Sequence, residues 1–228
     1  MKPVTGESGI LLIDKPYRWT SFDVVNKLRY VIKSDTGKRF KIGHAGTLDP
    51  LATGLLIICY GKETKSISKF MDFDKEYIAT FIMGSSTPCF DLEKPIDKHF
   101  PYKHITEGMI KAIFAKYTGE QDQIPPVFSA KQIDGRRAYK FARSGEEVEI
   151  KPVRINIYQL ELLKFNLPEI EIRIVCSRGT YIRALARDFG SELNSGAHIS
   201  VLRRTRIGSY KVEQAMLPEE FERLMNGQ

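Results

Sequence analysis

The stretch "GHAGTLDPLATGLL", from Gly43 to Leu56, decides how this sequence is interpreted. It contains three glycines, one histidine and one Asp-Pro step, and it leads into an apolar run that ends at Tyr60. An aspartate before a proline is a common way to begin a helix, because Asp caps the first turn and Pro suits its first position. The stretch therefore raises the question of whether Asp49 is a helix cap or a functional carboxylate among small residues.

Composition predicts a globular protein, because 42% of the 228 residues are apolar and 28% are charged. The longest uncharged run, Tyr77 to Phe90, has 14 residues, which is shorter than the ~20 that a membrane helix needs. The N-terminal apolar stretch is too short for a secretion signal. The three cysteines lie far apart and the four histidines lack metal-ligand spacing. We therefore expect a cytoplasmic protein with no membrane segment and no metal.

The net charge of +7 is concentrated in one segment. Between Arg173 and Lys211 there are eight Lys and Arg residues against two acidic residues, Asp188 and Glu192. Such a local excess of positive charge favours a polyanionic partner, because Lys and Arg residues that neutralise phosphates release counterions, which strengthens binding. A solvated basic helix face is the alternative.

Hydrophobic patterning predicts a chain of strands with interspersed helices. Helices are predicted at 20–34, 105–119, 179–193 and 217–225, the first with a capping box and the last with proline at its first position. Strands are predicted at 9–15, 77–84, 153–165, 169–177 and, as a basic strand or pair, 201–212. Residues 124–145 predict a strand, a turn at Asp134-Gly135 and a short helix closed by Gly145. Because strands and helices do not alternate regularly, as they do in successive βαβ units, the pattern predicts an α+β fold with a mostly antiparallel sheet.

Taken alone, Tyr77 is more typical of a core and Arg183 of a phosphate contact. In combination, six stretches resemble the bacterial tRNA pseudouridine synthases of the TruB type in order and spacing, over roughly residues 10 to 210. They are "DKPYRWTSFDVVNKLR", "GHAGTLDPLATGLL", "KEYIATFIMGSSTPCFD", "IPPVFSAKQIDGRRAY", "CSRGTYIRALARDFG" and "AHISVLRRTRIGSY".

This resemblance implies the pseudouridine synthase fold, with a central mixed, mainly antiparallel sheet, flanking helices and an RNA-binding cleft. It implies one catalytic domain over residues 1–228, with a core at about 8–212 and without the C-terminal PUA-type domain of longer relatives. The implied activity is isomerisation of uridine 55 in the T-loop of tRNA to pseudouridine. No cofactor is expected, since no electrons or groups are lost. The expected partner is the tRNA T-stem-loop, bound by a monomer without a protein partner.

The resemblance also implies three catalytic residues. Asp49 matches the family's essential aspartate, which acts on the ribose as nucleophile or as base. Arg183 matches the arginine that pairs with the aspartate, and Tyr77 matches the tyrosine that stacks on the flipped base. Small neighbours such as Gly43 let the carboxylate approach a sugar swung out of an RNA stack.

Further positions match substrate contacts of the family. His44 corresponds to the residue that fills the gap left by the flipped base, and Tyr181 and Leu202 correspond to residues around the uracil. The expected phosphate contacts are four cations: Lys15, Arg203, Arg204 and Arg206.

Two departures from the family pattern concern RNA contacts. Arg18 stands where the family usually has glycine, and Cys89 stands where it usually has Thr or Ser. Two other functions stay open: a pseudouridine synthase that acts on another RNA, and an RNA-binding or RNA-folding protein with secondary turnover.

Overall fold

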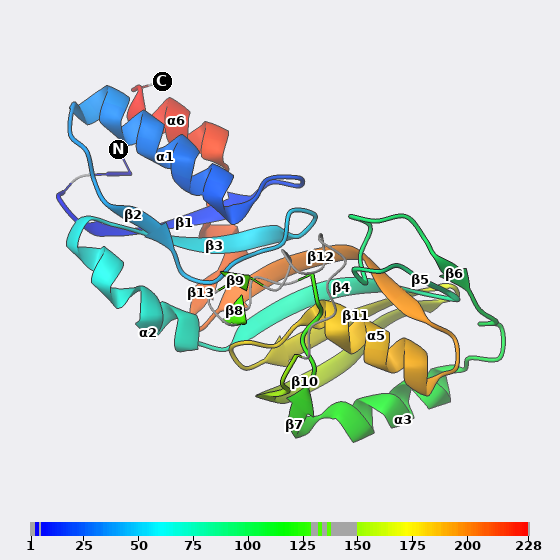
Figure 1. Cartoon of the computed structure of the whole chain (residues 1–228). Helices are drawn as coiled ribbons and strands as arrows, with labels where there is room; N and C mark the ends of the chain where they lie inside the picture. Colours follow the sequence, from blue (N-terminus) through cyan, green and yellow to red (C-terminus); the bar gives the residue numbers. More distant parts are fainter. Residues whose placement is uncertain (1–2, 5, 129–131, 134–135, 138–149, 228) are drawn as a thin grey trace. The chain divides into compact units, whose positions relative to one another are not determined.

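The computed structural model describes residues 3–4, 6–128, 132–133, 136–137 and 150–227 (Figure 1). The chain divides into two compact units. The first unit comprises residues 1–77 and 202–228, and the second comprises residues 78–201. Strands β4 (Lys75–Met83) and β12 (Ala197–Ile207) contribute residues to both.

The first unit is built on strand β3 (Thr53–Tyr60), which has a partner at each edge. Strands β1 (Gly9–Lys15) and β2 (Ile42–His44) pair with it antiparallel, while β12 pairs with it parallel through Arg203 and Arg204. Strand β13 (Tyr210–Lys211) forms a hairpin with the end of β12. The remaining elements are α1 (Ser21–Thr36), η1 (Gly61–Ser66), α2 (Ile67–Asp72), η2 (Val212–Gln214) and α6 (Pro218–Met225).

Helix α1 begins where the sequence predicts and continues to Thr36, two residues beyond the predicted end. Thr20 accepts a hydrogen bond from the backbone of Asp23, whose carboxylate accepts in return from the backbone of Thr20. Such a cap contributes about 1 kcal/mol. The helix ends at Gly37, whose φ of 67° suits a residue without a side chain. One face buries Val24, Val25, Leu28, Val31 and Ile32.

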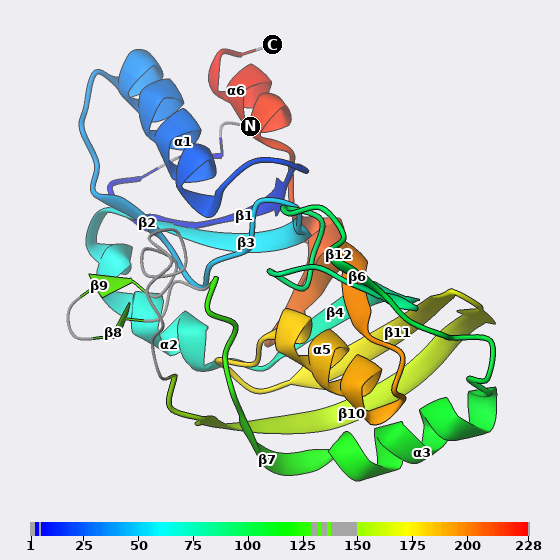
Figure 2. The same cartoon turned by 45° about the vertical axis from the view of Figure 1, so that its right-hand side comes forward.

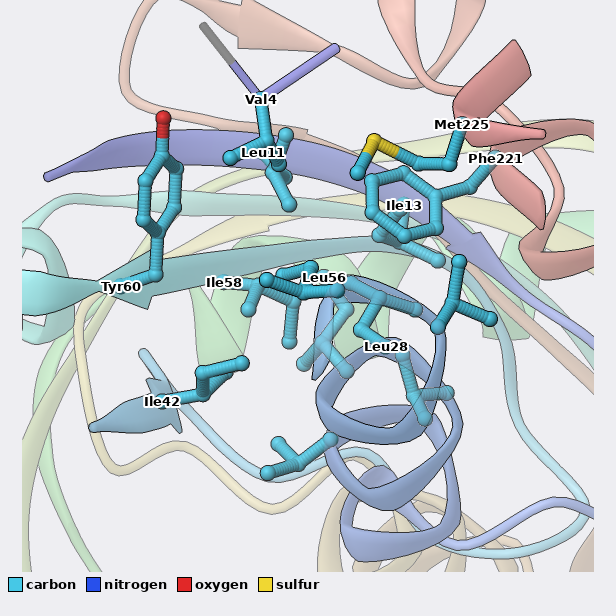
Figure 3. Close-up of a cluster of buried hydrophobic side chains, with 14 residues drawn as sticks. Val4, Leu11, Ile13, Leu28, Ile42, Leu56, Ile58, Tyr60, Phe221 and Met225 are labelled. Carbon is cyan, nitrogen blue, oxygen red and sulfur yellow. The ribbon is translucent and has the colours of Figure 1, made fainter. Parts of the chain in front are cut away.

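This apolar face packs in the core of the first unit, which lies between helices α1 and α6 and strands β1 and β3 (Figure 3). Figure 2 shows α1 and α6 side by side, and an ion pair of 2.5 Å between Lys27 and Glu222 joins them. Helix α6 starts with Pro218 at its first position, as predicted.

In the second unit the strand order is β12-β4-β11-β10-β7. The long strand β10 (Val153–Asn166) pairs antiparallel with both β11 (Glu169–Cys176) and β7 (Gly119–Gln123). Helices α3 (Glu107–Tyr117) and α5 (Ile182–Glu192) complete the unit, with Phe189 of α5 in ring contact with Phe81 and Phe114. The short pairs are β5 (Ser85–Ser86) with β6 (Lys98–His99) and β8 (Gln132–Ile133) with β9 (Arg136–Arg137).

The structure confirms the predicted α+β class with a mixed, mainly antiparallel sheet. The strand predicted before the turn at Asp134-Gly135 is confirmed only at β8, because residues 124–128 form no strand, and strand β7 lies just before them. The turn at Asp134-Gly135 and the helix ending at Gly145 lie outside the described residues. Among the described residues, no helix is long and apolar enough to span a membrane.

Candidate active site

Asp49 lies in a turn and not at the start of a helix, so the simple capping interpretation is wrong. The backbone turns back on itself at Pro50 and Leu51, and the amide of Ala52 donates to the carbonyl of Asp49 at 3.1 Å. We call residues 45–52 the Asp49 loop. Gly54, in the strand that follows the loop, has a φ of 103°, and a Cβ there would lie 2.2 Å from the carbonyl oxygen of Arg204. Only glycine fits this close approach of two backbones.

Buried side chains fix the backbone of the Asp49 loop on both sides of the aspartate. The guanidinium of Arg204 donates to the carbonyl of Leu55 at 2.8 Å and to that of Gly46 at 3.1 Å. The hydroxyl of Ser21 accepts from the amide of Leu48 at 2.8 Å and donates to its carbonyl at 3.1 Å. Sequence reasoning missed Ser21, although its place directly after a capping residue marks the start of α1.

Lys15 fixes the other end of the Asp49 loop. Its ammonium group donates to the carbonyls of Pro50, Pro16 and Trp19, at 3.2, 3.0 and 2.5 Å. Burial lowers the pKa of Lys15 from 10.5 to about 8, against the opposing effect of the negative charge of Asp49. The loop thus has one carboxylate and a buried cation in electrostatic contact.

The expectation that Lys15 and Arg204 contact phosphates is contradicted by their burial. Their side chains are 0% and 1% exposed, and both donate to carbonyls of the chain itself. The reason is strand register, because Lys15 of β1 and Arg204 of β12 both pair with Gly54 of β3. Arg203 is half-buried and forms a 2.6 Å ion pair with Asp14.

The other predicted residues of the first unit lie on neighbouring strands. Gly43 and His44 end β2, directly before the Asp49 loop, and pair with Cys59 and Ile58 of β3. Tyr77 belongs to the row of β4 side chains that is buried, while every second residue is partly exposed. Leu202 is partly exposed in β12. The first unit therefore carries Asp49 and most of the predicted substrate contacts.

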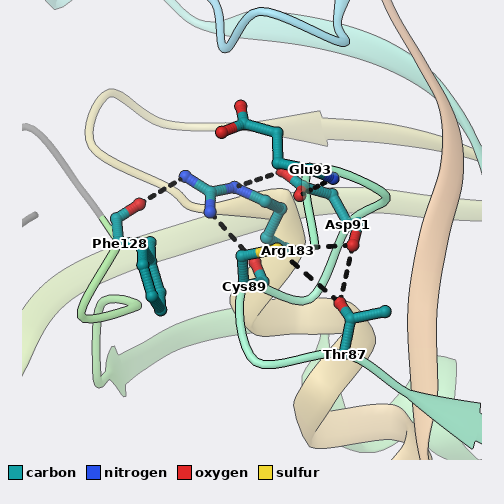
Figure 4. Close-up of polar contacts among 6 residues, drawn as sticks. All are labelled: Thr87, Cys89, Asp91, Glu93, Phe128 and Arg183. Carbon is teal, nitrogen blue, oxygen red and sulfur yellow. Dashed lines mark hydrogen bonds and ion pairs between the residues drawn. The ribbon is translucent and has the colours of Figure 1, made fainter. Parts of the chain in front are cut away.

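Arg183 lies in the second unit, near the start of α5, and is almost fully buried (Figure 4). Its Nε lies 3.4 Å from a carboxylate oxygen of Asp91. Its terminal nitrogens donate to the carbonyls of Cys89 and Phe128, at 3.0 and 2.8 Å. The other carboxylate oxygen of Asp91 accepts from the amide of Glu93 at 3.0 Å. Asp91 is therefore a buried carboxylate, whereas Asp49 is partly exposed, and Asp91 fixes the direction of Arg183.

The backbone of Tyr181 is also fixed, at the N-cap of α5. The side-chain amide of Gln123 accepts from the amide of Tyr181 at 2.8 Å and donates to its carbonyl at 3.1 Å. Gln123 is buried and ends β7. Strand β7 therefore sets the start of the helix that carries Arg183.

Ion pairs neutralise much of the basic segment, so its charge in sequence overstates its charge at the surface. The pairs within 4.0 Å are Arg173–Glu161, Arg183–Asp91, Arg187–Asp188, Arg203–Asp14 and Arg206–Glu76. Within the part of the chain that the structure describes, no group of three His, Cys, Asp or Glu side chains could hold a metal ion.

Comparison with solved structures and with family models gives the class. The chain aligns with one in the crystal structure of a Cbf5-Nop10-Gar1 complex, with a TM-score of 0.70 and 25% identity over 95% of this chain and 59% of that one. Residues 33–182 match the family model described as TruB family pseudouridylate synthase, N-terminal domain. Residues 183–226 match the C-terminal domain model of tRNA pseudouridylate synthase B. Fold and matches together define a pseudouridylate synthase.

Two curated relatives agree with these matches over nearly their whole length. The tRNA pseudouridine synthase B of Phocaeicola vulgatus is 54% identical over 223 residues, covering 97% of this chain and 95% of the relative. That of Flavobacterium johnsoniae is 54% identical over 218 residues and covers 95% of each. The chain belongs to the TruB family of pseudouridylate synthases.

Proposed function

We propose that this chain isomerises the uridine at position 55 in the T-loop of tRNA, with Asp49 as the essential carboxylate. The coarser activity follows from the family: the chain is an isomerase that makes pseudouridine in tRNA. The observation that supports Asp49 is the Asp49 loop, where Ser21, Lys15 and Arg204 bind backbone groups on both sides of it. A backbone held in this way fixes the position from which the Asp49 side chain extends before the substrate arrives.

The reaction breaks the bond between ribose C1′ and base N1 and forms a bond from C1′ to C5. The proton on C5 leaves and N1 gains one, so the atoms and electrons balance without a cofactor. The uridine must leave its stack to reach the enzyme, as for other enzymes that act on a base. Asp49 then acts on the ribose, either as a nucleophile at C1′ or as a base.

The other roles follow from the family resemblance. Arg183 is the proposed partner of the aspartate, and Tyr77 is the proposed stacking residue with a hydroxyl that takes part in proton movement at C5. His44 and Tyr181 are proposed RNA contacts, together with Gly43, Leu202 and Arg203. In place of phosphate contact, we assign to Lys15 and Arg204 the positioning of the Asp49 loop.

The test is Asp49→Asn, which keeps the shape of the side chain and removes its charge. We expect pseudouridine formation in tRNA to be lost while the affinity for tRNA changes little, because affinity comes mainly from phosphate contacts. The matched control is Asp122→Asn at an exposed acid of β7. Chemical mapping of pseudouridine reports position and extent. Turnover by the Asp49→Asn variant, or product at another position only, would contradict the proposal.

A further inference from the structure

Helix α1 presents an exposed face that combines aromatic rings with cations. We call Phe22, Asn26, Arg29, Tyr30 and Lys33 the α1 stripe, since their spacing places them within about 100° around the helix. Phe22 is 59% exposed and Tyr30 is 69% exposed. The helix buries its other face in the core, so the core does not require these two rings.

The side chains of the α1 stripe are arranged together. The guanidinium carbon of Arg29 lies 6.0 Å from the centre of the Phe22 ring, and a terminal nitrogen donates to the side chain of Asn26 at 2.8 Å. Among the described residues, neither Arg29 nor Lys33 forms an ion pair. A planar cation beside an exposed ring is a surface on which a nucleic acid base can stack.

The α1 stripe begins next to the Asp49 loop. Ser21, which binds the backbone of Leu48, is the residue before Phe22. The exposed Tyr17 and Arg18 precede the helix, and the amide of Arg18 donates to the carbonyl of Pro50 at 2.9 Å. The guanidinium carbon of Arg18 lies 5.6 Å from the centre of the Tyr17 ring. The exposed rings and cations therefore begin beside the Asp49 loop, at Tyr17 and Arg18, and continue along α1 as the α1 stripe.

Arg18 adopts a backbone conformation that arginine disfavours. Its φ is 67°, which costs a non-glycine residue about 1–2 kcal/mol. Strain of this kind is found at functional sites, where the side chain has a use that offsets it. The side chain at this position places a cation beside the Asp49 loop.

Charge indicates the chemistry of the partner. From Tyr17 to Lys41 the chain has seven Lys and Arg residues and two acidic residues. Lys27 pairs with Glu222 and Lys38 with Glu7, whereas Arg29 and Lys33 of the α1 stripe form no ion pair among the described residues. A second copy of this chain would bring like charges together across a twofold interface, and a purely apolar partner would leave the cations without a counterpart.

We propose that the α1 stripe, with Tyr17 and Arg18, binds unpaired nucleotides of the RNA that flank the flipped uridine. Unpaired bases offer open faces to the rings, and their phosphates pair with the cations. This inference rests on the proposed function for its substrate, the tRNA T-loop. It adds a binding surface that is separate from the residues that contact the reacting uridine.

Two double variants test the surface. Phe22→Leu/Tyr30→Leu keeps apolar area and removes stacking, and Arg29→Gln/Lys33→Gln removes two charges. Their matched control is Lys111→Gln/Lys116→Gln, at two exposed lysines of α3. All changed side chains are exposed, so circular dichroism should show unaltered folding. Dissociation constants are measured for whole tRNA, for a T-stem-loop hairpin and for a blunt duplex of the same stem.

We expect the aromatic variant to bind tRNA and hairpin about tenfold more weakly, with little change for the duplex. The charge variant should lower the slope of log affinity against log salt by about one to two. The control should match the wild type. Stripe variants within twofold of the wild type, or an equal loss for hairpin and duplex, would overturn the inference. So would a wild-type dimer that the aromatic change makes monomeric.

These binding measurements are independent of turnover. If the wild type makes no pseudouridine at position 55 but the stripe variants lose affinity for the hairpin, the proposed function fails and the surface stands. If product forms at position 55 and affinity is unchanged, only the surface fails.

Discussion

Ser21→Ala tests whether the Asp49 loop depends on one buried hydroxyl. The change leaves the amide and carbonyl of Leu48 without their partner in a site where Leu48 is 4% exposed. An unsatisfied buried polar group costs about 1–3 kcal/mol, so two groups predict a loss of about 2–6 kcal/mol in the free energy of unfolding. For a chain of this size, that corresponds to a fall of about 4–24 °C in Tm.

The larger effect should be on catalysis. A displacement of the carboxylate by about 1 Å costs on the order of a hundredfold in rate. We therefore expect kcat on tRNA to fall by about that factor, measured well below the Tm of the variant, while KM changes little.

Thr20→Ala is the control, because it removes the cap of α1 and leaves the bonds of Ser21 to Leu48 intact. It should cost about 1 kcal/mol in stability and keep kcat close to that of the wild type. If Ser21→Ala loses stability but keeps kcat within about threefold, the loop holds its shape without the hydroxyl and the reasoning is refuted.

Three further results are expected. Asp91→Asn removes the charge that pairs with the buried Arg183 and should lower the free energy of unfolding by about 2–4 kcal/mol in urea titrations. Asp188→Asn changes a more exposed ion pair and should cost under about 1 kcal/mol. Equal losses in the two variants would contradict the burial of the Arg183–Asp91 pair. Tyr77→Phe should keep tRNA affinity and greatly slow pseudouridine formation in single-turnover assays, and an unchanged rate would leave its hydroxyl without a role. Burial lowers the pKa of Lys15 from 10.5 to about 8, so between these pH values the unfolded chain binds more protons at this site than the folded chain does. The free energy of unfolding of the wild type, relative to that of Lys15→Met, should therefore rise from pH 8 to pH 10. A flat or falling difference would show that the pKa is not lowered.

Local features of the fold could be predicted because a few neighbouring residues determine them. The capping box at Thr20 and the proline at 218 fix where helices start, and alternation along β4 fixes its buried face. Strand β7 was missed because its sequence "GEQDQ" is polar, and pairing with β10 makes it a strand.

The supports of the candidate site could not be predicted, because they depend on pairings between distant residues. Lys15 and Arg204 are expected at the surface as cations, and only their common pairing with Gly54 buries them. Asp91 lies far from Arg183 in sequence, so nothing local marks it as the acid beside that guanidinium. The sequence motif predicts the position of Asp49, whereas strand register determines that Lys15 and Arg204 hold the backbone around it.

The charges around the Asp49 loop depend on one another, which affects how any change of Asp49 is interpreted. Lys15 and Arg204 are both buried, and the positive charge of Arg204 lowers the pKa of Lys15 while the negative charge of Asp49 raises it. Asp49→Asn therefore removes the charge that favours a protonated Lys15. A neutral amine has two hydrogens for three carbonyl acceptors, so the loop would lose a hydrogen bond as well as its carboxylate. Activity of this variant is best compared well below pH 8, where Lys15 keeps its proton and the missing carboxylate is the main difference.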